Sequence, residues 1–418
     1  MNKKLIHILT ATIPLVFFAQ ACTTTPETPA NSNQTGNNTK VDSKTPEKTP
    51  TSTDNKSTAN PKSEKTTTPA AVKENPEKSA KLTNMAKFLA GIKVDANTPL
   101  AAEQKTQAWK VYADYFDNSW KDLDKKQLAK IRTWSEQELK SINETPHPIF
   151  YPFSGPDFLY AYSFFPNGTN YIMAGLEPVG SIPEIEKKSD GEIDRKLQGI
   201  QNSLNAILNY SFFRTNDMKV DLSEKGVVPI LLVFLARTNN KILDLQYIQL
   251  KKDGTIQVAD KGNKEKLIPG VKIDFVPAGK TEPRTIYYFS GDLSDDGLKK
   301  TPEYIKFVQG FDKRITYLKA ASYLMHNEEF SKIRNLITSE SAALLQDDSG
   351  IPLKFFDAKK WNLNFYGNYT QPIALFSARY QPDLRKAYQG TKDIKPLNFG
   401  IGYQYEVNAS NLMLGTHK

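Results

Sequence analysis

The sequence predicts an α+β fold in which a mixed or mostly antiparallel sheet is flanked by amphipathic helices, after a disordered N-terminal tether. In several segments apolar residues recur at helical spacing, whereas other segments alternate apolar and polar residues as strands do. The two kinds of segment follow one another without a regular βαβ rhythm. No glycine-rich phosphate loop accompanies them, so a nucleotide-binding sheet is not indicated.

The N-terminal 80 residues differ from the rest in composition. Residues 1–21 have a short basic start and an apolar run from Leu5 to Phe18, which is typical of a secretory signal peptide and too short for a permanent membrane span. Residues 23–80 contain no aromatic side chain and are rich in Thr, Pro, Lys and Asn, so we expect a disordered linker. We expect one globular α+β domain over residues 81–418.

Cys22 is the only cysteine in the 418 residues, and it directly follows Ala19-Gln20-Ala21, a small-x-small cleavage site. Residues 1–22 resemble a bacterial lipoprotein signal peptide, whose cysteine becomes the lipidated first residue of the mature chain. The resemblance implies attached fatty acids such as palmitate, a linker anchored at residue 22, and a place in the cell envelope. Thr23, where an Asp could stand, implies the outer membrane. The alternative is plain secretion with an unmodified thiol.

Charge is spread along the chain. The formal net charge of +9 comes from 55 Lys and Arg against 46 Asp and Glu, and the basic runs lie beside acids. This pattern indicates solvated surfaces and disfavours a nucleic-acid partner. The partners that we expect are the membrane, through the lipid anchor, and an envelope protein or glycan.

The elements of the first half follow from periodicity. Aromatic and aliphatic residues at three- and four-residue spacing predict helices over residues 109–120, 128–139 and 197–212. The apolar run 227–237 fits a buried helix or a buried strand. Residues 242–258 read as a hairpin that turns at Asp253-Gly254. Strands over 271–276 and 285–290 follow, and Thr301-Pro302 opens another helix.

The last third mixes both types. We expect helices over residues 317–326 and 330–337, and a hairpin over 342–356 that turns at 347–350. Alternating apolar residues predict further strands at the end of the chain, over residues 363–369, 372–376 and 400–407.

A candidate catalytic segment begins at His147 and contains Phe-Ser-Gly-Pro-Asp at 153–157. One interpretation is a junction between a strand and a helix, with Ser154 or Gly155 as the cap, Pro156 in the first helical position and Asp157 at the positive end of the helix. Phe-Ser-Gly-Asp at 289–292 repeats the arrangement. The alternative is a hydrolase with Ser154 as nucleophile, Asp157 beside it and His147 or His326 as base. The Gly-x-Ser-x-Gly motif is missing.

Asp347 and Asp348, with Gln346 and His326, form a candidate site for a divalent cation, because such ions prefer oxygen ligands. The same residues suit an ordinary turn in which Gly350 supplies positive φ. No cofactor is predicted.

Taken together, these patterns favour a cell-envelope lipoprotein whose tethered body acts by binding or by structural association. The patterns favour a protein that is not an enzyme, and the alternative is a periplasmic or surface hydrolase that uses the Ser154 region. Two carboxylates of a glycosidase would leave no sequence signature.

Overall fold

The computed structural model describes residues 74–186, 188–210, 212, 226–260 and 267–418. The expected signal peptide, Cys22 and most of the expected linker lie outside these residues. No helix in the described part of the chain is long and apolar enough to cross a membrane.

The described residues form one sheet of ten strands in the order β4-β3-β5-β6-β2-β1-β7-β8-β10-β9. Its centre is parallel and consists of β6 (Arg284–Ser290), β2 (Asn170–Gly175), β1 (Ile149–Tyr151), β7 (Ile315–Leu318) and β8 (Ala343–Gln346). Antiparallel strands extend both sides, with β3 (Lys241–Leu250), β4 (Ile256–Val258) and β5 (Ile268–Val276) on one side and β9 (Trp361–Gly367) and β10 (Asn411–His417) on the other. The mixed sheet and flanking helices confirm the predicted α+β class.

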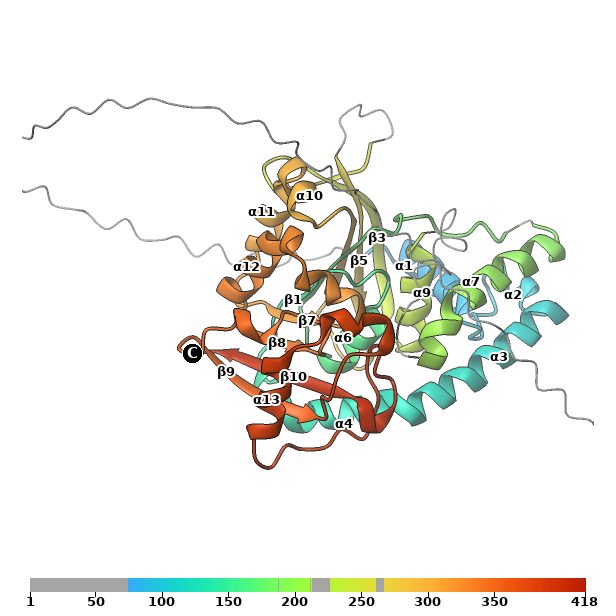
Figure 1. Cartoon of the computed structure of the whole chain (residues 1–418). Helices are drawn as coiled ribbons and strands as arrows, with labels where there is room; N and C mark the ends of the chain where they lie inside the picture. Colours follow the sequence, from blue (N-terminus) through green and yellow to red (C-terminus); the bar gives the residue numbers. More distant parts are fainter. Residues whose placement is uncertain (1–73, 187, 211, 213–225, 261–266) are drawn as a thin grey trace, which may run out of the picture. The chain divides into compact units, whose positions relative to one another are not determined.

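Helices cover both faces of the sheet. On one face Tyr151, Tyr171 and Tyr317 pack with helices α1 (Pro76–Leu89), α3 (Gln107–Leu123), α4 (Ala129–Glu138), α6 (Phe158–Phe164), α7 (Asp190–Tyr210) and α9 (Val228–Arg237). On the other, Phe150, Ile172 and Leu318 pack with α10 (Asp295–Lys300), α11 (Glu303–Gln309) and α12 (Ser331–Glu340). Neighbours in one strand thus enter opposite cores, as the two-residue period of a strand requires. Figure 1 shows α10 to α12 on one side of the sheet and α1, α7 and α9 on the other.

Helix α1 (Pro76–Leu89) begins inside the expected linker, so the prediction that residues 76–80 are disordered is wrong. The Asn75 side chain caps the helix by accepting from the Lys78 amide at 3.1 Å, and Pro76 occupies the first turn. Ser79 then donates to the carbonyl of Ile242 in β3 at 2.7 Å. Composition missed this turn because its contacts are capping and long-range bonds rather than apolar burial.

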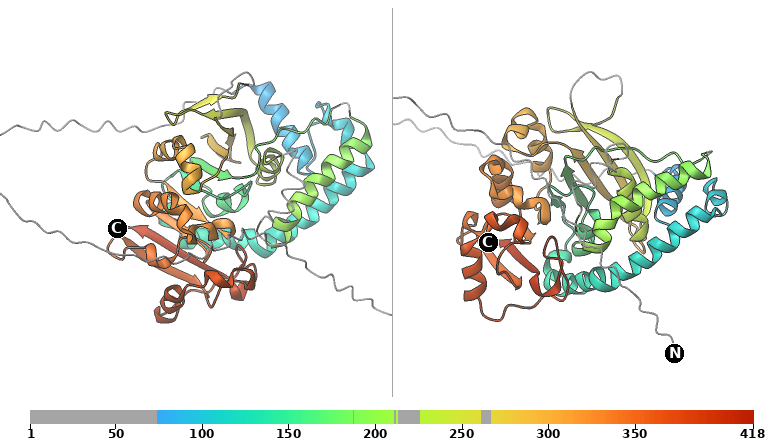
Figure 2. Two further views of the ribbon diagram at one scale, coloured as in Figure 1. Left: turned by 45° about the horizontal axis from the view of Figure 1, so that its top comes forward. Right: turned by 45° about the vertical axis from the view of Figure 1, so that its right-hand side comes forward.

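The predicted helices of the first half are confirmed. Helices α3 and α4 are joined through a π-helical turn at Asp124–Leu128, and Figure 2 shows α3 and α7 side by side. Tyr115 of α3 donates to Asn205 of α7 at 2.6 Å. The ambiguous apolar run is helix α9, buried on nearly all sides. Short helices complete this region at α2 (Leu100–Glu103) and α5 (Lys140–Asn143).

The hairpin of β3 and β4, the strands β5 and β6, helix α11 after Pro302 and helix α12 also confirm their predictions. The predicted helix over 317–326 is wrong in its first part. There the chain completes the parallel strand β7 and turns into the 3-10 helix η2 (Ala320–His326). A short turn η3 (Glu328–Phe330) leads into α12.

The hairpin predicted over 342–356 is wrong as well. Strand β8 pairs with β7 in parallel and with β10 antiparallel, so the turn at 347–350 closes no hairpin. Gly350 is not among the described residues with positive φ. A Cβ on Gly350 would lie 2.3 Å from Gln346 Oε1, which accepts from the Ile351 amide at 2.8 Å. Glycine is needed there for space and not for backbone conformation.

Among the last three predicted strands, only residues 363–369 form one, which is β9. Residues 372–376 lead into the 3-10 helix η5 (Ala374–Arg379), and residues 400–407 form a loop with a single bridge between Ile401 and Gln404. The remaining elements are η4 (Leu353–Phe355), α13 (Pro382–Gly390) and η6 (Val407–Ala409).

Candidate functional site

The connections of β1 and β7 leave the sheet toward opposite faces. Strand β1 runs through α6 to β2 on one side of it, whereas β7 runs through η2 and α12 to β8 on the other. Helix α6 packs in one core and α12 in the other. In open sheets with parallel strands, ligands bind outside the carboxyl ends of the strands at such a reversal. The crevice between the ends of β1 and β7 is therefore the first place to seek a site.

A buried ion pair occupies this crevice. Lys319 directly follows β7, and Asp157 follows β1 as the cap of α6. Lys319 Nζ lies 2.5 Å from Asp157 Oδ2, and the two side chains are 2 % and 3 % exposed. Lys319 Nζ also lies 3.6 Å from the centre of the Tyr160 ring, a cation–π contact.

Asp157 is held by further donors. The Tyr151 hydroxyl donates to Asp157 Oδ2 at 3.0 Å, and the Tyr160 amide donates to Oδ1 at 3.3 Å. Burial raises the pKa of Asp157, and the nearby Lys319 ammonium opposes the rise. Burial lowers the pKa of Lys319, and the carboxylate of Asp157 opposes that fall. The fold thus favours the neutral form of each group while each stabilises the charge of the other.

The backbone is strained at both strand ends. Phe153 and Ala320 each have φ of +58°, a region that costs a residue with a side chain about 1–3 kcal/mol. Phe153 follows β1, and Ala320 follows Lys319 at the end of β7. Strain of this kind gathers at sites where the surrounding structure fixes side-chain positions.

A small cavity of about 40 Å³ opens beside the ion pair. It combines three aromatic rings with four polar side chains, and it is lined by Tyr151, Phe153, Ser154, Gly155, Asp157, Glu177, Phe212, Lys319, Ala320 and Ala321. Burial raises the pKa of Glu177, whose Oε2 lies 3.4 Å from the Tyr288 hydroxyl. The space fits one polar group of a larger molecule.

Ser154 and Asp157 come together in this cavity, but the histidines do not join them. Ser154 is 6 % exposed, and its hydroxyl lies 3.0 Å from the carbonyl of Gly155 and 3.2 Å from that of Ala174. His147 precedes β1 and so lies at the amino-terminal end of the parallel strands, away from the crevice. There its carbonyl accepts a hydrogen bond from the Thr169 amide. His326 lines a different cavity. Within the described ranges, no histidine hydrogen-bonds to Ser154, so the geometry supplies no imidazole base for it.

The junction interpretation holds with a different cap. Asp157, not Ser154 or Gly155, caps α6, and Pro156 lies before the helix. In the repeated segment, Ser294 caps α10 by accepting from the Gly297 amide at 3.1 Å, and Asp292 accepts from the Ser294 amide. Asp157 is thus a capping residue and a member of the buried pair at once.

Asp347 and Asp348 directly follow β8 and so lie at the same carboxyl end of the parallel strands as Asp157 and Lys319. Asp347 accepts from the amide and hydroxyl of Ser349 and from the Ala320 amide. Asp348 accepts from the Tyr323 hydroxyl at 2.5 Å and from Asn411 Nδ2 at 3.0 Å. Every oxygen of the pair already has a protein donor. The described part of the chain holds no cluster of three or more His, Cys, Asp or Glu that could bind a metal ion.

Lys319, Tyr323 and Asn411 were not among the candidates from the sequence. Lys319 could have been found only by recognising residues 315–318 as a parallel strand, because the first residue after such a strand lies at the edge where sites form. Asn411 lies at the start of β10, a strand that was not predicted.

A comparison of the chain with protein-family models, with curated proteins and with solved structures finds no match.

Proposed function

We propose that the chain is a lipid-anchored protein of a bacterial envelope whose body binds a hydroxyl-bearing ligand, such as an envelope glycan, without catalysing a reaction on it. The observation that carries the binding proposal is the Lys319–Asp157 pair beside a cavity at the reversal between β1 and β7.

A contribution to the stability of the fold does not by itself explain why an ion pair is buried at this position. Removing two charges from water costs several kcal/mol for each ion, and replacing such a pair by apolar residues is often neutral or stabilising. Groups whose pKa is strongly altered by burial and by a charged partner occur often at functional sites. The pair therefore favours recognition of a ligand.

The lining of the cavity suits sugar hydroxyls. Carboxylates accept hydrogen bonds from the hydroxyl groups of a sugar, and an ammonium group donates hydrogen bonds to the oxygens of those hydroxyl groups. Phe153 and Phe212 contribute apolar ring surface on the same cavity. Because the volume is only about 40 Å³, one substituent of the ligand enters it and the rest stays outside.

The test uses the full chain and a double variant, Lys319→Met with Asp157→Asn. Met keeps the length of the side chain, and Asn keeps the cap of α6, so both charges are lost with little change in packing. The probes are soluble peptidoglycan fragments and lipopolysaccharide core oligosaccharides. Isothermal calorimetry measures their binding to each protein. We expect wild-type binding to weaken about tenfold or more in the variant, because charge-assisted hydrogen bonds are lost.

The chain offers a matched control in a second Lys–Asp pair on β5. Lys272 Nζ lies 2.6 Å from Asp274 Oδ2, and their side chains are 19 % and 2 % exposed. Lys272→Met with Asp274→Asn should leave binding unchanged. Equal binding by the site variant would refute the binding proposal. Covalent labelling of Ser154 by a fluorophosphonate would refute the non-catalytic part and favour the hydrolase.

A further inference from the structure

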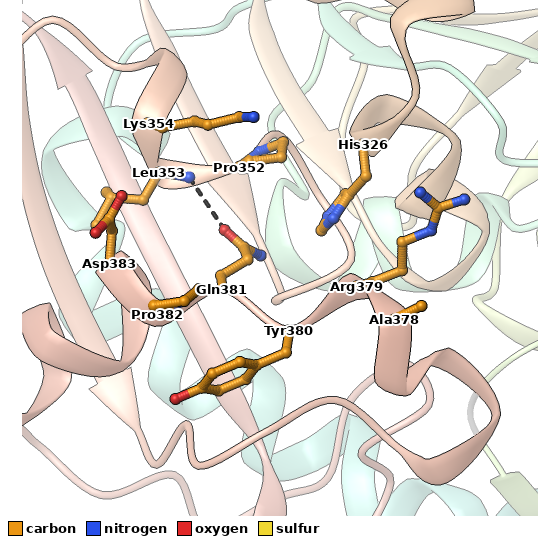
Figure 3. Close-up of a pocket in the computed structure, with 10 residues that line it drawn as sticks. All are labelled: His326, Pro352, Leu353, Lys354, Ala378, Arg379, Tyr380, Gln381, Pro382 and Asp383. Carbon is orange, nitrogen blue, oxygen red and sulfur yellow. Dashed lines mark hydrogen bonds between the residues drawn. The ribbon is translucent and has the colours of Figure 1, made fainter.

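A second cavity, of about 230 Å³, lies between the end of η2, the turn at η4 and the segment that leads into α13. Figure 3 shows the ten residues that line it: His326, Pro352, Leu353, Lys354, Ala378, Arg379, Tyr380, Gln381, Pro382 and Asp383. None of them lines the cavity beside Lys319.

The lining carries an excess of positive charge. Lys354 and Arg379 are cationic and Asp383 is the one acid among the ten, which leaves +1 with His326 neutral. In Figure 3 the heads of Lys354 and Arg379 lie on either side of the His326 side chain. In the part of the chain that the structure describes, neither cation forms an ion pair with an acid, and Lys354 Nζ lies 5.0 Å from the centre of the Phe355 ring. Their charges are therefore available to a ligand.

His326 adds an unpaired polar atom. In Figure 3 its imidazole points from η2 toward Gln381 and the middle of the cavity. Nε2 is shielded from solvent and has no hydrogen-bond partner among the described residues. Burial, with the Arg379 charge as the second cause, lowers the pKa of His326 to about 4. A buried polar atom without a partner is costly, and in the neutral ring Nε2 is an acceptor, so a donor group on a ligand would recover that cost.

Gln381 holds the two sides of the cavity in place. Its Oε1 accepts from the Leu353 amide at 3.1 Å, as Figure 3 shows, and its Nε2 donates to the Asp348 carbonyl at 2.9 Å. Gln381 is also the N-terminal cap residue of the nine-residue helix α13, so the positive end of that helix faces the same space. The cations are thus presented by a frame that is formed before any ligand binds.

We propose that this cavity binds a small anion through a carboxylate or phosphate group that contacts Lys354 and Arg379. Arginine pairs with both groups through two parallel hydrogen bonds, and lysine contributes a point charge. The volume equals that of roughly seven or eight water molecules at about 30 Å³ each, which is enough for a small organic acid or a phosphate ester.

The test titrates the full chain with inorganic phosphate and, in a separate arm, with succinate, at constant ionic strength set by sodium chloride. We expect saturable binding in calorimetry with at least one of the two anions. Phosphate alone would identify a phosphate site, succinate alone a carboxylate site, and both a general oxyanion site.

Two variants make the result specific. In Lys354→Gln with Arg379→Gln, the affinity should fall about tenfold for each cation removed, since hydrogen bonds to charged groups are lost. Lys386→Gln changes a lysine of α13 that does not line the cavity and should bind as wild type does. Circular dichroism confirms that each variant is folded.

Two results would overturn the proposal: no saturable binding of either anion by the wild type, or equal affinity in the double variant and the wild type. Because the first depends on the wild type alone, the proposal is testable even if the double variant does not fold.

Discussion

The carboxyl of Asp347, at the carboxyl end of the parallel strands, makes the stability of the chain depend on pH. Burial, and then the charge of Asp348, raise its pKa to about 7 from a usual 3.8. The folded chain therefore holds a proton there up to about pH 7, whereas the unfolded chain releases it near pH 4. Since the unfolded state binds fewer protons in this window, the free energy of unfolding falls as pH rises through it.

Asp347→Asn should reduce this dependence, because an amide does not titrate and only Asp348, whose pKa burial also raises, remains. Between pH 5 and pH 8 we expect the wild type to lose about 2–3 kcal/mol more of its free energy of unfolding than the variant loses. Urea unfolding at the two pH values measures the difference. The comparison is between the changes in the free energy of unfolding of the two proteins from pH 5 to pH 8. A difference in their absolute stability therefore does not affect the result. Parallel pH profiles for the two proteins would contradict the expectation.

Some residues of the crevice could be identified from the sequence and others could not. Ser154, Asp157, Asp347 and Asp348 stand out because turn and cap chemistry marks them. Lys319 does not, since a lysine among apolar neighbours is ordinary on a helix surface. Its burial depends on β1 and β7 becoming neighbours, and those strands are more than 160 residues apart in the chain. Local patterns carry no information on that pairing.

Among the elements, the loop at residues 400–407 places a glycine directly against the Asp347 carboxyl. Gly402 has φ of +57°, and a Cβ there would lie 2.1 Å from Asp347 Oδ2. Gly402→Ala should therefore reduce the free energy of unfolding by about 2–3 kcal/mol, through backbone strain and displacement of the Asp347 carboxyl. Thermal and urea unfolding measure the loss.

Gly191 in the first turn of α7 provides the matched control. A Cβ there would meet nothing within 4 Å, and the glycine has no positive φ. Gly191→Ala should change stability by less than about 1 kcal/mol, in the stabilising direction, because alanine favours a helix. If both alanine variants behaved alike, the close approach of Gly402 to Asp347 would not be what limits that position.

Helices and strands could be predicted from the sequence where one face of the element is buried in a core and the other face is exposed. Helices α3, α4, α7, α11 and α12 and the hairpin of β3 and β4 follow from local spacing and turn residues. Strand β7 did not, because Tyr317 and Leu318 are buried on opposite faces and the next residues form a helical turn. A short central strand that is buried on both sides has no alternation to detect. Strand β2, whose six residues are all buried, was missed for the same reason.

For the molecule as a whole, attachment to a membrane stays a prediction from residues 1–22. In a bacterial host, the wild type should fractionate with membranes, and intact-mass analysis should show a chain that begins at Cys22 and carries fatty acids. Cys22→Ala should leave the membrane fraction, because the thiol that receives the lipid is missing. A variant that stays membrane-bound with unchanged processing would refute lipidation.

The place of β10 in the sheet bears on how the protein is made. This strand is inserted between β8 and β9, although it follows both in the chain, and its first residue bonds to Asp348. During synthesis β8 therefore presents an open edge until residues 411–417 have left the ribosome. The signal peptide predicted from residues 1–22 implies export, and an exported chain of this kind passes through a narrow channel unfolded. If residues 1–22 direct export, we expect the late arrival of β10 to delay closure of this side of the sheet and so to keep the chain able to pass through the channel.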